Sequence, residues 1–127
     1  MIDLMTKKFS KWISKQRISK KELLIALKEL KESNFEANLG GNIFKKRIRF
    51  AGKGKSGSGR TIICYKKDDR AIFVHGFSKN EKSNLSSKEL VALKEFSKIL
   101  LSLSAKEIST AIKNGDFMEV KDEKLNS

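Results

Sequence analysis

Residues 43–78 contain three segments with the side-chain pattern of β-strands, separated by short connections. The first, 43–50, alternates apolar and basic side chains, and the second, 60–66, is rich in residues that favour strands. The third, 70–78, follows the turn residues 67–69. Because parallel neighbours need a crossover of about a dozen residues or more, the short connections predict an antiparallel meander.

Two helical patterns precede these strands. Apolar side chains recur at helical spacing within 7–15, and Ser19 with Glu22 has the capping-box pattern at the start of a helix from Lys20. The wide apolar face of this helical arm, residues 1–39, favours packing on the sheet. The alternative, open to any basic amphipathic helix, is contact with a membrane or RNA.

Two further helical patterns, together spanning 87–114, follow the strands. Ser87 is the expected cap of a helix over 88–103, and Ser104 with Glu107 repeats the capping-box pattern for the next helix. The apolar residues expected to face the core from the first of these helices are Leu90, Leu93, Phe96, Leu100 and Leu101.

A last strand over 117–120 and a tail over 122–127 complete the chain. This order predicts a single α+β domain over 1–121, in which a small antiparallel sheet, the sheet core 43–80, packs with N-terminal and C-terminal helices. No internal repeat or interdomain linker interrupts it.

The composition favours a polyanionic partner. The chain carries a formal net charge of +13, which suits nucleic acid first, an anionic membrane surface second and an acidic protein segment third. A solubility feature of a lysine-rich proteome would look the same. The sequence has no apolar run of about 18 residues and no secretory signal pattern, so we expect a cytoplasmic protein with no membrane partner. The single cysteine, Cys64, excludes an internal disulfide.

The positive charge is concentrated around a glycine-rich segment. Arg47–Arg60 has the sequence RIRFAGKGKSGSGR, and the longer stretch Lys45–Arg70 holds ten basic and two acidic residues. Gly54-Lys55-Ser56 resembles part of a phosphate-binding P-loop, but that motif needs glycine where Arg49 stands and must open a helix. A P-loop is therefore excluded.

The residues outside this segment do not suggest another catalytic centre. The carboxylates lack the spacing of a two-metal nuclease, and the lone histidine supports no Ser-His-Asp arrangement. We therefore predict no metal and no cofactor. A cation-rich site could instead promote attack of an RNA 2′-hydroxyl on the neighbouring phosphate. Arg47, Arg49 and Arg60 can share one face of the sheet if the first two strands pair in the predicted alternation, and arginines there would stabilise the added charge. A lysine near other cations could transfer protons near neutral pH.

Three segments of the chain stand out together: GKGKSGSGR, GFSKNEKSNL and the helix start SSKEL. They resemble the RelE/ParE superfamily of bacterial toxins, with the HigB-like branch most similar, and the resemblance covers about Gly40–Val120. It implies a RelE-like fold and an mRNA interferase of a type II toxin-antitoxin system, which cuts messenger RNA in the 30S A site of the ribosome. It also implies a co-encoded antitoxin, expected to be a helix-turn-helix protein.

The resemblance assigns roles to several residues by position. Arg60 matches the family's catalytic arginine, Lys79 matches the basic residue at the end of the next strand, and Arg47 and Arg49 match the basic pair before the loop. Some RelE-type enzymes have tyrosine near Ser86. Arginine also often replaces Asn80 in them, so the general acid and base stay open. ParE-like relatives act on gyrase, and fold alone does not decide the activity.

The remaining candidate residues have weaker roles. His75 and Glu81 are candidates for proton transfer, although a histidine between Phe73 and Phe77 favours a partly buried structural role. The basic residues expected to grip RNA phosphates are Lys45, Lys46, Lys53, Lys55 and Lys66. Alternatives to the nuclease are a basic module that binds RNA or the ribosome without cutting, and a toxin of this fold that acts on a protein target.

Overall fold

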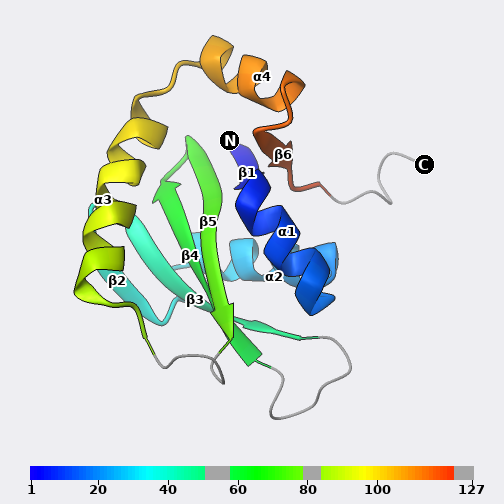
Figure 1. Cartoon of the computed structure of the whole chain (residues 1–127), viewed down its shortest axis with the longest axis vertical. Coiled ribbons are helices and arrows are strands. Elements are labelled where there is room, and N and C mark those ends of the chain that lie inside the picture. The colour runs from blue at the N-terminus through cyan, green and yellow to red at the C-terminus, as the bar shows by residue number, and fades with distance from the viewer. Residues whose placement is uncertain (51–57, 79–83, 122–127) are drawn as a thin grey trace.

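A six-stranded sheet in the order β2-β3-β4-β5-β1-β6 forms the centre of the molecule (Figure 1). The computed structural model describes residues 1–50, 58–78 and 84–121. The strands are β1 (Ile2–Thr6), β2 (Ala37–Gly40), β3 (Ile43–Arg49), β4 (Ser58–Lys66), β5 (Arg70–Ser78) and β6 (Phe117–Glu119).

The predicted meander is confirmed, because β3, β4 and β5 pair antiparallel in chain order. The predicted last strand is also confirmed as β6. The sequence patterns missed β1 and β2. β1 pairs parallel with β5 and antiparallel with β6, so the sheet is mostly rather than wholly antiparallel. β1 is short and lies next to a helix start, where Thr6 caps the helix with its side chain, so no turn separates the two elements.

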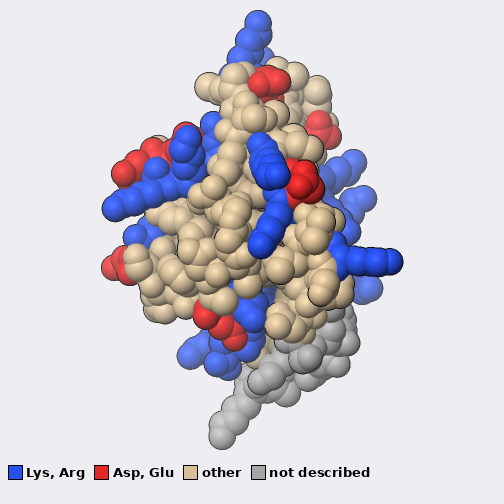
Figure 2. All heavy atoms as spheres, turned by 90° about the vertical axis from the view of Figure 1, so that its left-hand side faces the viewer, with Lys and Arg blue, Asp and Glu red and all other residues tan. Residues whose placement is uncertain are grey.

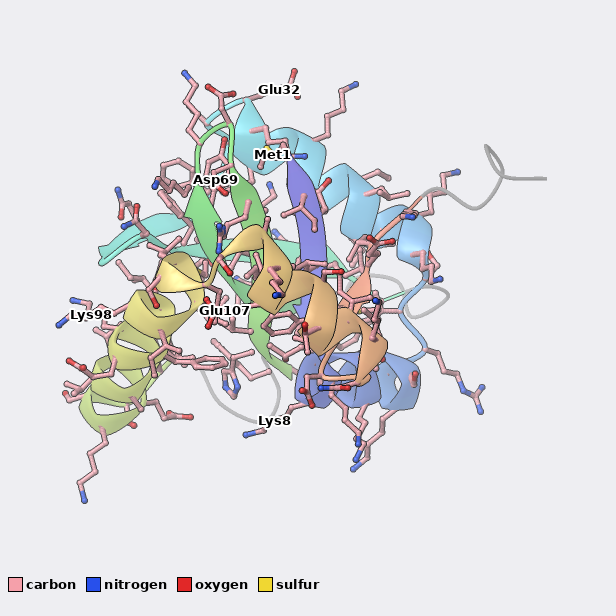
Figure 3. The ribbon with its side chains drawn as sticks, turned by 90° about the horizontal axis from the view of Figure 1, so that it is seen from above. Met1, Lys8, Glu32, Asp69, Lys98 and Glu107 are labelled. Carbon is pink, nitrogen blue, oxygen red and sulfur yellow. The ribbon has the colours of Figure 1, made fainter. Side chains whose placement is uncertain are left out.

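Four helices cover the two faces of the sheet. They are α1 (Lys7–Gln16), α2 (Lys20–Lys31), α3 (Ser87–Ser102) and α4 (Ala105–Lys113). One apolar core lies beneath α1 and α2, and the other lies beneath α3 and α4. Seen from above, Glu32 at the end of α2 and Lys98 on α3 lie on opposite sides of the sheet (Figure 3). The predicted α+β class is confirmed, with helices from both ends of the chain packed on the sheet.

Two details of α3 differ from the sequence prediction. The cap is Ser86 rather than Ser87, and Ser86 and Glu89 form both hydrogen bonds of a capping box. Phe96, expected in the core, is 37% exposed, whereas Ser97 is buried and donates to the Gly41 carbonyl. Ser97 also contacts the buried thiol of Cys64, so this turn of α3 faces the sheet with a small polar side chain.

Two glycines allow large aromatic rings to approach the backbone closely on the α1 side of the sheet. A Cβ atom on Gly76 would stand 2.4 Å from the ring of Trp12, and one on Gly59 would stand 2.8 Å from the ring of Phe50. Any larger residue would displace these rings. Gly59 lies in β4 next to Arg60, and Gly76 lies in β5 next to His75, so this close packing helps to position the backbone of two candidate site residues.

Candidate functional site

Arg47 and Arg60 lie directly opposite each other across the β3–β4 pair. Side chains at directly opposed positions have Cβ atoms about 5 Å apart, so the two arginine side chains leave the sheet next to each other on one face. Arg49 lies two residues further along β3, opposite Ser58, and therefore on the same face. The shared face that the alternation predicted is confirmed, whereas the catalytic role of these arginines stays a prediction.

Glu36 holds Arg60 in place. Its Oε2 atom lies 2.6 Å from Nε of Arg60 and 4.0 Å from Nζ of Lys45. The Arg60 side chain is only 13% exposed, and its Nη1 donates to the Gly59 carbonyl. One carboxylate thus offsets part of the charge of Lys45 and Arg60, and it fixes the orientation of the Arg60 guanidinium group.

His75 lies on the same face, one row away from Arg60. It is opposite Ile62 on β4, whereas Arg60 is opposite Phe77. Its Nε2 atom is 3.9 Å from Oε2 of Glu89, a distance at which a small movement would complete an ion pair. The side chain is 23% exposed, in agreement with the partly buried position expected from its neighbours. We call Lys45, Arg47, Arg60 and His75 the basic face.

The basic face lies toward the end of the sheet formed by Arg49, Ser58 and Ser78. Arg49 is opposite Ser58, and Gly59 is opposite Ser78, so the ends of β3, β4 and β5 meet there. Asn84, which lies before α3, accepts a hydrogen bond of 3.4 Å from Lys45. The predicted site residues Lys53, Lys55, Lys79 and Glu81 lie outside the described residues.

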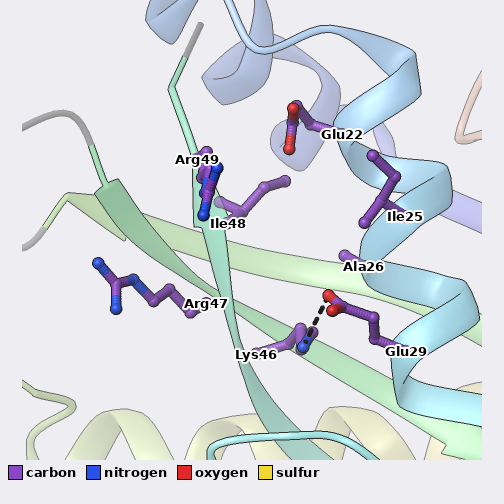
Figure 4. Close-up of a pocket in the computed structure, with 8 residues that line it drawn as sticks. All are labelled: Glu22, Ile25, Ala26, Glu29, Lys46, Arg47, Ile48 and Arg49. Carbon is purple, nitrogen blue, oxygen red and sulfur yellow. Dashed lines mark ion pairs between the residues drawn. The ribbon is translucent and has the colours of Figure 1, made fainter. Parts of the chain in front are cut away.

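Two of the lysines predicted to grip phosphate do not join the basic face. Lys46 points to the opposite side of the sheet, is 6% exposed and pairs with Glu29 of α2 at 3.1 Å (Figure 4). Alternation along β3 predicts this position, because Lys46 lies two residues before the apolar Ile48 and therefore on the same face of the sheet. Lys66 ends β4 six residues beyond Arg60, about 20 Å away at strand spacing, and lies near Asp69. We therefore leave both out of the proposed site.

Sequence reasoning missed the two carboxylates that contact the basic face. Glu89 could have been found, because Ser86 and Glu89 have capping-box spacing and the cap places Glu89 in the first turn of α3. Glu36 carries no such signal. It precedes β2, a strand of four residues that the pattern did not reveal, and its contact with Arg60 depends on the pairing of β2 with β3.

The described part of the chain contains no group of three or more histidine, cysteine, aspartate or glutamate side chains placed to hold a metal ion. None of its helices is long and apolar enough to cross a membrane.

Comparison with protein families identifies the family of the chain. The family model described as the RelE toxin of the RelE/RelB toxin-antitoxin system matches residues 3–120. The chain belongs to the RelE toxin family. No curated protein matches it closely enough to assign a more specific function. As a RelE toxin it is the toxin half of a toxin-antitoxin pair, and family membership implies a cognate antitoxin as its partner.

Proposed function

We propose that this RelE-family toxin is an endoribonuclease that cuts messenger RNA on the ribosome and so stops translation and growth. The observation that carries the proposal is the opposed pair Arg47 and Arg60, with Arg60 held by Glu36. Two guanidinium groups on neighbouring strands suit the two sides of a phosphodiester, because each can donate two hydrogen bonds to phosphate oxygens. The HigB-like branch is the part of the superfamily that the loop segments favour.

The proposed reaction is an internal transfer. The RNA 2′-hydroxyl attacks the adjacent phosphorus, a P–O bond forms, and the bond to the 5′-oxygen breaks. A base takes the proton of the 2′-hydroxyl, and an acid protonates the departing 5′-oxygen. Arg60 and Arg47 stabilise the extra negative charge on the phosphoryl oxygens in the transition state. The products are a 2′,3′-cyclic phosphate and a new 5′-hydroxyl end.

Two groups compete for the proton transfers. The resemblance places Lys79 in the catalytic set, whereas the described basic face offers His75, because imidazole is a common general acid or base. The carboxylate of Glu89 lies 3.9 Å from Nε2 of His75, where it would help to orient the imidazole ring. Arg49 and Lys45 flank the arginine pair and would bind neighbouring phosphates. In this proposal the 30S A site presents the RNA strand to the basic face.

Induced expression tests the proposal in cells. The wild-type chain should arrest growth within one or two generations, and Arg60→Ala should relieve the arrest, because loss of one charge-stabilising group lowers such rates about 10²–10³-fold. Arg17→Ala is the matched control, since Arg17 is an exposed arginine at the end of α1. Both variants should be shown to be folded by circular dichroism. Arrest by Arg60→Ala equal to that of the wild type would refute the catalytic role.

A further inference from the structure

A β-bulge in β5 turns His75 onto the basic face. On β4, Ile62 pairs with His75. The next residue, Ile63, pairs with Phe73, so Val74 is an extra residue in β5. Under strict alternation His75 would share the side of Phe73, which packs beneath α1 and α2. The bulge instead sets His75 opposite Ile62, whose side chain faces the core beneath α3 and α4.

The capping box of α3 brings a carboxylate to His75. The backbone N–H of Ser86 donates to Oε1 of Glu89 at 2.9 Å, and the backbone N–H of Glu89 donates to Oγ of Ser86 at 3.1 Å. These two bonds fix the first turn of the helix, and Oε2 of Glu89 lies 3.9 Å from Nε2 of His75. The carboxylate therefore serves two groups, one at each oxygen.

A carboxylate at this position stands among cations. Lysines and arginines are more prominent than acidic side chains on the side of the molecule that α3 covers (Figure 2). In the described residues the basic face meets two carboxylates, Glu36 at Arg60 and Glu89 at His75. Glu36 offsets the charge of an arginine. Glu89 faces His75, whose neutral ring has one donor and one acceptor nitrogen and can therefore transfer a proton.

The carboxylate of Glu89 selects one tautomer of the neutral imidazole. A proton on Nε2 of His75 can point to Oε2 of Glu89, which leaves the lone pair of the ring on Nδ1. The Nε2–Oε2 distance of 3.9 Å is about 1 Å longer than a hydrogen bond. Catalytic hydrogen bonds are often long without substrate and shorten in the complex. A carboxylate, an oriented imidazole and a hydroxyl in sequence form the arrangement that activates hydroxyl nucleophiles.

We propose that Glu89 is a positioning residue that holds the proton of His75 on Nε2, so that Nδ1 accepts the proton of the RNA 2′-hydroxyl. This role rests on the proposed nuclease function and makes His75 its base. As the 2′-oxygen forms its bond to phosphorus, its proton passes to Nδ1. The bond from phosphorus to the 5′-oxygen breaks, and a second group protonates that oxygen. His75 touches the reacting hydroxyl, and Glu89 acts only through His75.

A second capping box in the same chain supplies the matched control. At the start of α4 the backbone N–H of Ser104 donates to Oε1 of Glu107 at 2.9 Å, and the N–H of Glu107 donates to Oγ of Ser104 at 3.1 Å. The 16 residues of α3, about 24 Å of helix, separate the two boxes. Glutamine also completes a capping box, so Glu89→Gln and Glu107→Gln keep the caps and remove one negative charge each. Of the two, Glu89 is the one that faces His75.

Nitrogen-15 NMR of the imidazole in the full-length toxin tests the tautomer without RNA. The chain has one histidine, so its ring signals are unique, and at alkaline pH their shifts report which nitrogen holds the proton. In Glu89→Gln a side-chain amide N–H replaces Oε2 and donates to Nε2, so the tautomer ratio should move at least about threefold toward the Nδ1–H form. Glu107→Gln should keep the wild-type ratio. Equal ratios in the wild type and Glu89→Gln would overturn the inference.

Cleavage of messenger RNA on ribosomes tests the consequence. His75→Ala should lower kcat at least about 10²-fold, as expected for loss of a general base. Glu89→Gln should lower kcat at least about tenfold and change KM less than about twofold, because it misplaces the base. Adding it to His75→Ala should cause no further loss, since Glu89 acts through His75, and Glu107→Gln should cleave like the wild type. Additive losses, or full activity of Glu89→Gln, would overturn the inference, whereas failure of the proposed nuclease would appear as uncut messenger RNA with the wild type.

Discussion

Removing the Glu36 carboxylate should destabilise the protein and open its basic face to other anions. In Glu36→Gln, Arg60 loses a charge-assisted hydrogen bond of 2.6 Å, and Lys45 loses its nearby counter-charge. Such bonds contribute about 1.5–3 kcal/mol, and Glu36 is 36% exposed, so the lower end of that range applies. The opposed Arg47–Arg60 pair adds roughly 0.5 kcal/mol of uncompensated repulsion. We expect a loss of about 2 kcal/mol in the free energy of unfolding.

Thermal unfolding at two salt concentrations measures this effect. A loss of about 2 kcal/mol corresponds to roughly 6–8 °C in Tm for a chain of this size. The difference from wild type should shrink in about 1 M NaCl, because salt screens the exposed part of the cluster. Inorganic phosphate should raise the Tm of Glu36→Gln more than that of the wild type, since the oxyanion takes the place of the carboxylate.

Glu32→Gln is the matched control for charge. Glu32 is an exposed carboxylate at the end of α2, and in the described part of the chain it forms no ion pair. Its substitution should change Tm by less than about 2 °C. If Glu36→Gln and Glu32→Gln unfold alike and respond alike to phosphate, Glu36 does not hold the basic face together.

Three further substitutions or reactions test the packing around the site. Arg70→Met should lower the free energy of unfolding, measured by urea titration, by about 2–3 kcal/mol. The reason is that buried Arg70 donates hydrogen bonds of 2.8 Å to the carbonyls of Leu100 and Leu103 at the end of α3. An unchanged urea midpoint would contradict this capping role. Gly76→Ala should cost about 2 kcal/mol by the same measurement, since its methyl group would overlap the Trp12 ring. Burial raises the pKa of the Cys64 thiol, so Cys64 should react with a thiol reagent only after the protein is denatured. Rapid reaction of Cys64 in the native protein would show that its side chain lies outside the core.

The fold was largely predictable where local patterns coincide with the tertiary structure. Strand β5 was predicted over its full length of 70–78, and the start of α4 followed from the Ser104 and Glu107 capping box. β2 was missed because a strand of only four residues, which ends at Gly40 beside Gly41, carries too little periodicity. β1 was missed because its place depends on a parallel partner 68 residues later, since Ile2 pairs with Arg70. Such non-local pairing has no local signal.

The candidate site was predictable only in part, for a similar reason. Alternation along β3 brought Arg47 and Arg60 to one face once the strands paired, and the structure confirms that register. The same alternation should have excluded Lys46 from the phosphate-binding residues. Lys46 lies on the same face of β3 as the apolar side chains and is buried against Glu29. The contact of Glu36 with Arg60 depends on tertiary structure alone.

The chemistry of newly made RNA ends tests the central proposal most directly. Purified toxin would be added to ribosomes translating a defined messenger RNA, and the fragment ends would be identified by whether ligation requires prior phosphorylation. The proposed 2′-hydroxyl attack predicts 5′-hydroxyl ends that ligate only after phosphorylation, at a rate about 10²–10³-fold lower for Arg60→Ala and unchanged for Arg17→Ala. Fragments with 5′-phosphate ends, or arrested translation with intact messenger RNA, would contradict it.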